Sequence, residues 1–265
     1  MPGTRERSHR SPLTRKLAHF APLSAEDVRI LDELGSSDER FEADRDIVCE
    51  GEVPRSVFVL LEGMACRYRI LPGGGRQIMT FLIPGDLCDL HVFLIRAMDH
   101  SIGTLVPTRL AAVARERVLD LAVRRPRISA ALWWSSLQEE AILRERLVAL
   151  GRRSARERVA YLLCELFWRH QAVGLVEGRE FALPLTQIEL ADTLGLTPVH
   201  VNRALQSLRR QALITLEHRR LVLLDVDALQ DIAAFNKDHL HLGGAPAEIR
   251  TYFDRLERER GSETF

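Results

Sequence analysis

The segment from Glu189 to Arg210, ELADTLGLTPVHVNRALQSLRR, constrains the fold more than any other part of the chain. Thr186 and Glu189 have the three-residue spacing of a capping box, which predicts that a helix begins at Gln187. We expect this helix to stop at Gly195, because glycine is the favoured residue just after a helix C-terminus. The pattern therefore predicts a short helix that ends in a tight turn.

A second helix is predicted directly after the turn. Thr197 suits the N-cap position, and Pro198 suits the first helical position, where its fixed φ and missing N–H cost nothing. The apolar residues of this helix recur at helical spacing and should face inward, namely Val201, Leu205 and Leu208. The outer face is left to His200, Asn202, Arg203, Gln206, Arg209 and Arg210. Helix, glycine turn and helix together are typical of a helix-turn-helix.

The residues after this helix, ALITLEHRRLVLLD, predict a strand, a turn and a strand, and His218 lies in the turn. An ordinary helical hairpin would explain the caps and the glycine, but not the local excess of positive charge. From Pro198 to Arg220 the exposed positions carry five arginines against the single acid Glu217: Arg203, Arg209, Arg210, Arg219 and Arg220. We therefore interpret the segment as a DNA-reading helix with a basic wing.

The composition of the whole chain excludes some classes of protein but does not indicate a function. Its 265 residues include 37 Lys and Arg and 37 Asp and Glu, so the formal net charge is zero. This net charge gives no support for a nucleic-acid partner, and the argument for DNA must therefore rest on the local basic patch. The apolar runs are far too short to span a bilayer, so no membrane partner is expected. The four cysteines lack CxxC spacing, which indicates a cytoplasmic protein without disulfides or a bound metal.

The region from Phe41 to Ala114 has a different sequence pattern, in which short runs of β-branched and aromatic residues are separated by turns that contain glycine. In CRYRI, for example, Cys66, Tyr68 and Ile70 alternate with two arginines, as in a half-buried strand. Many short strands at near-regular spacing predict an antiparallel β-roll. With the helices around it, the expected fold class is α+β.

A long helix is predicted from about Ile128 to Leu150. Its apolar residues form two stripes, one with the two tryptophans and the other with Leu132, Leu143 and Leu150. A helix that packs only on its own domain needs one stripe, so we assign the second to a dimer interface with another copy of the chain.

These elements divide the chain into five parts. We expect a disordered basic tail at 1–12, a signal-sensing β-roll with flanking helices at 13–127 and a dimerisation helix at 128–151. A winged helix-turn-helix at 152–235 and a C-terminal extension at 236–265 follow. The end of the extension, AEIRTYFDRLERERGSETF, predicts an additional amphipathic helix to which we assign no role.

The order of roll, long helix and winged helix-turn-helix resembles the Crp/Fnr family of bacterial transcription regulators over about residues 20–235. The motifs that carry the resemblance are EGEVPRSVFVLLEGMACRY and PGDL in the roll, and LTQIELADTLGLTPVHVNRALQSLRRQALI in the C-terminal part. The resemblance implies a homodimer on a palindromic promoter site, contacts with RNA polymerase, and a roll that senses a signal which the sequence does not identify.

The family's DNA contacts map onto individual positions of this chain. Arg203 matches the base-reading arginine, whose fork suits guanine O6 and N7. Val199 stands where a glutamate reader is common, and His200 and Asn202 are secondary readers. Phosphate contacts are expected from Thr186, Thr197, Gln206, Arg209, Arg219 and Arg220.

The family's effector pocket maps onto Asp86, Leu87, His100, Ser101, Leu143 and Arg144. The resemblance places Asp86 where cyclic-nucleotide binders have the acid that meets the ribose. Cyclic-nucleotide binders that this chain resembles have an Arg-Ser pair for the cyclic phosphate, where this chain has His100-Ser101. They also have a Thr-Ser pair on the long helix, where this chain has Leu143-Arg144. Since a fixed guanidinium is missing and histidine is neutral for much of the time near pH 7, we do not expect cyclic AMP binding.

Two cofactors of the family were weighed as alternatives. Iron–sulfur members carry an N-terminal cysteine cluster, whereas no cysteine precedes Cys49 here, so no cluster is expected. Haem members place Cys and His near the start of the cassette. Cys88 and His91 resemble that pair with a different spacing, and a buried cysteine with an ordinary histidine is the simpler interpretation.

Two other classes of function remain as alternatives. The chain could be a ligand-binding regulatory module whose helix-turn-helix contacts protein, although the basic wing favours DNA. An enzyme would need a nucleophile, a base and an orienting group, and no such set is visible. Cys164 and His170 lie on one predicted helix but six residues apart, which points them to different faces.

Overall fold

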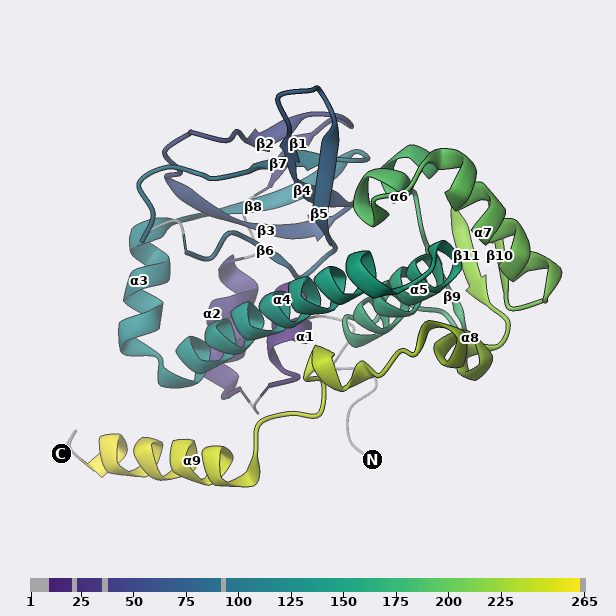
Figure 1. The fold of residues 1–265 in the computed structure, drawn as a ribbon. Coiled ribbons are helices and arrows are strands. Elements are labelled where there is room, and N and C mark those ends of the chain that lie inside the picture. The colour runs from purple at the N-terminus through teal and green to yellow at the C-terminus, as the bar shows by residue number, and fades with distance from the viewer. Residues whose placement is uncertain (1–9, 21–22, 35–37, 92–93, 263–265) are drawn as a thin grey trace.

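The computed structural model describes residues 10–20, 23–34, 38–91 and 94–262. A β-roll lies at one end and a winged helix-turn-helix at the other, and one long helix runs along both (Figure 1). Most of the tail predicted at 1–12 falls outside the described residues. Its last residues are ordered, however, since Ser11 caps a helix that begins at Pro12 and donates its N–H to Asp32 at 2.8 Å. The boundary of that prediction was therefore wrong.

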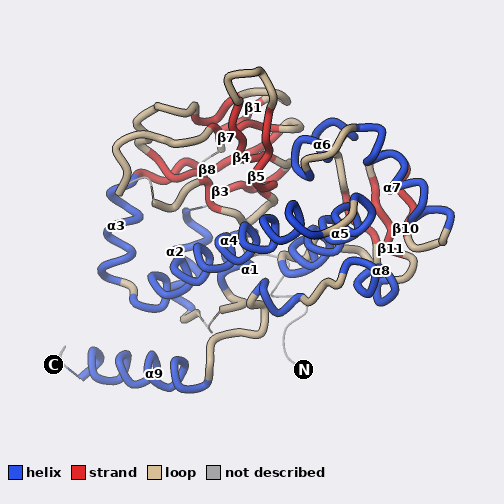
Figure 2. Tube along the Cα trace, in the orientation of Figure 1, coloured by secondary structure: helices blue, strands red, loops and turns tan. Residues whose placement is uncertain are grey.

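The roll consists of two four-stranded antiparallel sheets, as the strand pattern predicted (Figure 2). One sheet has the order β1-β8-β3-β6 and the other β2-β7-β4-β5. Their strands are β1 (Glu39–Phe41), β2 (Asp46–Val48), β3 (Ser56–Glu62), β4 (Ala65–Ile70), β5 (Arg76–Leu82), β6 (Leu87–Cys88), β7 (Ser101–Thr104) and β8 (Thr108–Ala114). Helices α1 (Pro12–Leu17), α2 (Ala25–Leu34) and α3 (Arg115–Arg124) flank the roll.

Strand β4 departs from the half-buried pattern expected of CRYRI. Arg67, predicted on a solvent face, is buried, whereas Ile70 is 59% exposed at the tip of the β4–β5 hairpin. The cause is tertiary, because the long helix α4 (Pro126–Arg152) lies near this strand and its Glu139 pairs with Arg67 at 3.2 Å. Strand alternation predicts the two faces but not what covers them.

Helix α4 (Pro126–Arg152) is the long helix that the sequence predicted, extended by two residues at each end. Of the three residues assigned to its dimer stripe, Leu132 is only 8% exposed because it packs among α1, α2, α3 and the roll. Leu150 is half-buried and would touch any side chain at Gly195. Only Leu143 is exposed, so the proposed stripe was wrong in two of its three members.

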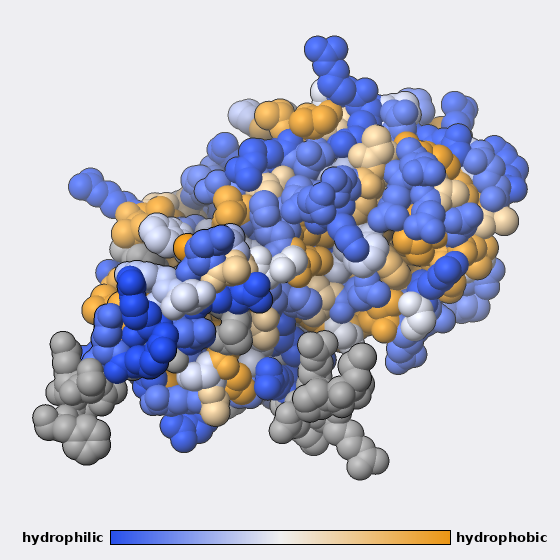
Figure 3. Space-filling view, turned by 90° about the horizontal axis from the view of Figure 1, so that it is seen from below, coloured by the Kyte–Doolittle hydropathy of each residue, from blue (hydrophilic) through white to orange (hydrophobic). Residues whose placement is uncertain are grey.

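The large apolar residues that α4 does expose form a different row. They are Trp133, Leu137, Leu147 and Val148, with Leu143 at the edge. Trp133 and Leu147 are 77% and 73% exposed. Seen from below, the molecule also shows hydrophobic patches between hydrophilic side chains (Figure 3).

The C-terminal domain begins with α5 (Ala155–Ala172), which is capped by a Ser154–Glu157 capping box. The helix-turn-helix consists of α6 (Gln187–Leu194) and α7 (Pro198–Arg210). The wing is formed by β10 (Ile214–Glu217) and β11 (Arg220–Leu223), and β9 (Glu180–Ala182) extends it to three strands. Helix α8 (Val226–Ala233) packs on α5.

The C-terminal extension is joined to the rest of the fold. The short 3₁₀ helix η2 (Lys237–Leu240) lies on α4, where Gln138 donates to the Leu240 carbonyl at 2.6 Å. The predicted amphipathic helix is α9 (Ala247–Ser262). Its Phe253 is only 8% exposed, and its Asp254 pairs with Arg127 of α4 at 2.7 Å. The extension therefore links the C-terminal domain to the sensor side of the molecule.

Candidate DNA interface and sensor site

Helix α7 exposes one face to solvent and buries the other against its domain. Thr197 accepts a hydrogen bond from the His200 N–H, and Pro198 occupies the first turn, so the helix begins where the sequence predicted. Gly195 has φ 60°, which closes the turn after α6 in a conformation that glycine adopts without strain. Val201, Leu205 and Leu208 are buried beneath the helix and hold it to the domain.

The four predicted base readers are all exposed on α7: Val199, His200, Asn202 and Arg203. Within the described part of the chain, the Arg203 side chain makes no hydrogen bond or ion pair, so its guanidinium fork is available to an external acceptor. His200 is more constrained, because its Nδ1 lies 3.0 Å from the Thr197 hydroxyl. Arg203 is thus without the kind of internal contact that constrains His200.

The predicted phosphate contacts divide into two groups. Thr186, Thr197, Gln206 and Arg219 are exposed, and Arg219 lies at the tip of the wing with φ 61°. The Thr186 and Thr197 hydroxyls also cap α6 and α7, accepting the N–H of Glu189 and of His200. The side chains of the other two residues, both arginines, have partners within the protein too. Arg209 donates to the Leu216 carbonyl at 2.9 Å, and Arg220 forms an ion pair with Glu180. These two therefore shape the wing in this structure, a role that sequence spacing did not predict.

The predicted effector pocket is not assembled. Asp86 was assigned to a bound ribose, but its carboxylate is buried between Lys16 of α1 at 2.8 Å and Arg169 of α5 at 2.7 Å. Gly85 permits this approach, since a Cβ there would lie 2.7 Å from the Pro12 carbonyl oxygen. Burial alone would raise the pKa of Asp86, but the two cations outweigh it and lower the pKa to about 2.

Asp86 is one member of a buried chain of five alternating charges: Lys16, Asp86, Arg169, Glu165 and Arg146. Glu165 pairs with Arg169 at 3.1 Å and with Arg146 at 3.0 Å. All five side chains are at most 7% exposed. Sequence patterns did not predict this network, because all of its pairs except Glu165–Arg169 join residues far apart along the chain and Lys16 lies in no motif.

His100 belongs to a second cluster of polar side chains, which is only partly buried. Its Nε2 lies 3.0 Å from Asp89, whose other oxygen lies 3.1 Å from Arg67 Nε. Desolvation lowers the pKa of His100, but the hydrogen bond and the charge of Asp89 outweigh it, so the pKa is raised. The Asp89 carboxylate thus lies between the Arg67 guanidinium and the His100 ring.

The remaining predicted pocket residues are dispersed. Leu87 is part of the apolar core between the roll and its helices. The Ser101 hydroxyl accepts from the Glu50 N–H at 2.9 Å. Arg144 is exposed on α4 and pairs with Glu140 at 3.2 Å, while Leu143 is exposed beside it. The prediction of one pocket from these residues was therefore wrong for this conformation.

Cys88 and His91 do not face one another as a ligand pair would. Cys88 is 2% exposed, and burial raises the pKa of its thiol. His91 Nε2 lies 3.2 Å from the Ser136 hydroxyl on α4. Among the described residues, no group of three or more His, Cys, Asp or Glu side chains could hold a metal ion. None of the helices in that part of the chain is long and apolar enough to cross a membrane.

Comparisons with known proteins agree with this architecture. Residues 157–232 match the Crp-like helix-turn-helix domain, and residues 38–125 match the cyclic nucleotide-binding domain. The chain is 30% identical over 222 residues to the nitrogen fixation regulation protein FixK of Bradyrhizobium diazoefficiens, covering 83% of this chain and 91% of that protein. It is 32% identical over 187 residues to the transcriptional activatory protein AadR of Rhodopseudomonas palustris, covering 70% of this chain and 76% of that protein.

A solved structure of FixK2 from Bradyrhizobium japonicum aligns with a TM-score of 0.68 at 27% identity, covering 76% of this chain and 98% of that one. The sequence matches and the structural alignment thus both agree with a β-roll followed by a winged helix-turn-helix in which α7 is exposed. The chain belongs to the Crp/Fnr family, and it is a DNA-binding transcription regulator.

Proposed function

We propose that this regulator acts as a homodimer, binds a roughly palindromic promoter site through α7, and contacts RNA polymerase. The observation that carries the proposal is Arg203, exposed on α7 and without an internal partner among the described residues. A guanidinium fork in that position can donate two parallel hydrogen bonds to guanine in the major groove.

The dimer proposal rests on the exposed apolar row of α4. Monomeric proteins rarely leave contiguous large apolar side chains in water, and helix-on-helix packing would cover this row. A dimer also explains a palindromic site, because two symmetry-related helices must enter the major groove about one helical turn apart, roughly 34 Å.

The signal sensed by the roll is not cyclic AMP in this proposal. Asp86, the acid expected to meet the ribose, is held by Lys16 and Arg169. His100, at the position of the phosphate-binding arginine, is held by Asp89. Binding the nucleotide would require Asp86 to leave its buried cationic partners and His100 to leave Asp89, at a considerable cost. An iron–sulfur cluster and haem are likewise not proposed, and the signal is an unidentified small molecule or another input.

We further propose a cytoplasmic location and no catalytic activity. The protein would reach chromosomal DNA directly, and the charged side chains described above serve structure and recognition. The relatives are regulators by name, which supports this interpretation.

Selection from random double-stranded DNA, followed by sequencing, tests the proposal. The wild-type protein should enrich two inverted half-sites at a fixed spacing. A sequence without inverted symmetry, or no enrichment above the starting pool, would contradict it. Gel-shift stoichiometry on the selected site should give two chains per duplex.

A further inference from the structure

A cavity of about 780 Å³ lies outside both the DNA interface and the sensor site described above. Its walls come from the end of α1, from α4, from α5 and from the C-terminal extension between Lys237 and Pro246. This volume lies within the range of small-molecule sites in proteins. The part of the wall that the extension forms lies outside both domain matches, which cover residues 38–125 and 157–232, whereas the α5 residues of the wall lie inside the second match.

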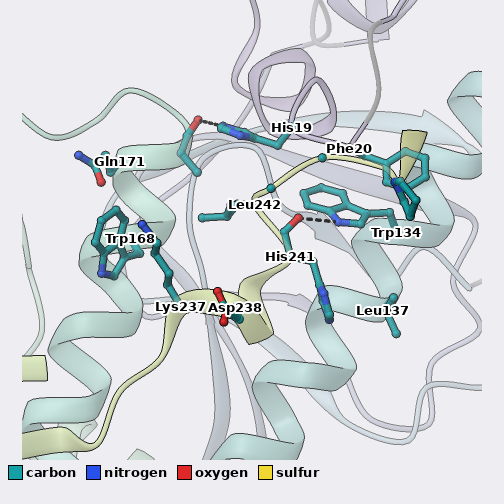
Figure 4. Close-up of a pocket in the computed structure, with 14 residues that line it drawn as sticks. His19, Phe20, Trp134, Leu137, Trp168, Gln171, Lys237, Asp238, His241 and Leu242 are labelled. Atoms are coloured by element: carbon teal, nitrogen blue, oxygen red, sulfur yellow. Dashed lines mark hydrogen bonds between the residues drawn. The ribbon is translucent and has the colours of Figure 1, made fainter. Parts of the chain in front are cut away.

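The side walls of the cavity are aromatic. Phe20 and Trp134 lie on one side with their ring centroids 6.1 Å apart, Trp168 lies on the other, and Leu242 lies between them (Figure 4). The Trp134 N–H already donates to the His241 carbonyl at 3.1 Å. Its ring therefore offers an apolar surface without an unsatisfied donor, which suits a flat apolar ligand.

The polar groups around the rings are mainly cationic or neutral. Lys237 Nζ lies 4.3 Å from the Trp168 ring centroid, and within the described residues no carboxylate lies within ion-pair distance of it. His19 Nε2 lies 2.6 Å from the Ala172 carbonyl. A carbonyl only accepts, so Nε2 carries the proton and Nδ1 is left for another partner.

Asp238 is the one acid among the described lining residues, opposite in charge to Lys237. The Asp238 Oδ2 accepts a hydrogen bond from Asn236 Nδ2 at 2.8 Å. The backbone N–H of Asp238 donates to Asn236 Oδ1. The carboxylate is thus engaged outside the cavity's aromatic walls. A ligand that enters would meet Lys237 as the principal charged group.

We propose that this cavity binds a small organic anion with a flat aromatic body, whose charged group pairs with Lys237 and whose rings lie between Trp134 and Trp168. The site is independent of DNA recognition. It includes Leu137, which also belongs to the exposed row of α4, so an occupant contacts the surface assigned to the dimer.

The test uses anilinonaphthalene sulfonate, an aromatic anion whose fluorescence rises in apolar sites, titrated into the full chain. Gly243 lines the cavity, and a Cβ there meets nothing within 4 Å, so Gly243→Phe adds a large side chain at the cavity wall without a clash. Gly73→Phe is the matched control, because Gly73 also has open space and lies in the distant β4–β5 hairpin. Lys237→Gln removes the charge alone.

The expected result is saturable binding of one probe per chain, unchanged in Gly73→Phe and abolished in Gly243→Phe. Binding should weaken by about tenfold in Lys237→Gln, which corresponds to the loss of one charge-assisted contact. Uncharged phenylnaphthylamine should bind wild type and Lys237→Gln equally. Thermal melting of each variant establishes that it is folded.

Equal binding of the sulfonate to wild type and Gly243→Phe would overturn the site. So would a complete loss of binding in Leu147→Glu with retention in Gly243→Phe, because the probe would then lie on the exposed row of α4. Equal affinity of the sulfonate for wild type and Lys237→Gln would overturn the assignment to an anion.

Discussion

The carboxylate of Asp86 in the roll lies 2.7 Å from the guanidinium of Arg169 on α5, deep inside the protein. This ion pair joins the sensor domain to the DNA-binding domain, and Lys16 of α1 adds a third member. The acid assigned from the family pattern to a ligand is therefore part of the contact between the two domains. Any signal that moves the domains apart must first separate these charges.

Asp86→Ala should destabilise the protein by about 3–5 kcal/mol, because it leaves two buried cations without their shared partner. Chemical denaturation measures the change. Asp192→Ala is the matched control, since it removes the more exposed pair with Arg76, whose side chains are 32% and 23% exposed. The control should lose no more than about 1 kcal/mol. Equal losses in the two variants would contradict the network's role.

The same carboxylate should make stability depend on pH. Its pKa in the folded protein is about 2, below the ordinary 3.8, so its contribution is complete above pH 3.8 and is lost as the pH falls toward 2. Asp86→Asn should lack this loss, which amounts to about 2 kcal/mol of the unfolding free energy. Parallel unfolding curves for wild type and variant between pH 5 and pH 2 would argue against it.

Leu147→Glu should convert the proposed dimer to monomers. Leu147 is 73% exposed on α4, and a dimer through the row would bury two unpaired carboxylates at a cost of several kcal/mol. Val123→Glu is the control, because Val123 is 77% exposed on α3, away from the row. Sedimentation velocity should show monomers for the first variant and dimers for the second. A dimeric Leu147→Glu protein would place the interface elsewhere.

Arg203→Ala should weaken binding to the selected site by about 1–3 kcal/mol per half-site and relax the preference at one base pair. Arg219→Ala should instead weaken binding to all sequences and reduce the salt slope by about one unit, as expected for one phosphate contact. Arg250→Ala on α9 is the control, because it removes one positive charge outside the proposed DNA interface and should leave DNA binding unchanged. If selection returned the parental consensus for Arg203→Ala, Arg203 would not be the reader.

Cyclic AMP should show no saturable binding in the micromolar range by titration calorimetry at neutral pH. Asp86 and His100 are each held by buried partners, so neither is free to meet a nucleotide. Affinity for the selected DNA should be the same with and without the nucleotide. A clear isotherm would mean that the roll rearranges to release these groups.

The sequence by itself determined the parts of this protein that depend on neighbours close along the chain. Thr186 with Glu189, Gly195, and Thr197 with Pro198 act within one helical turn, so the helix-turn-helix and its exposed Arg203 could be predicted to the residue. The antiparallel roll was also predictable, since strand alternation and turns are local patterns.

Only the tertiary structure decided which side chains pair and which faces are covered. Leu132 and Leu143 lie on one side of α4 by spacing, yet other helices cover the first and leave the second in water. Asp86 meets Lys16 and Arg169 across separations of 70 and 83 residues. Helical and strand periodicity assign a residue to a face, but burial and charge pairing depend on what packs against that face, which only the folded chain determines.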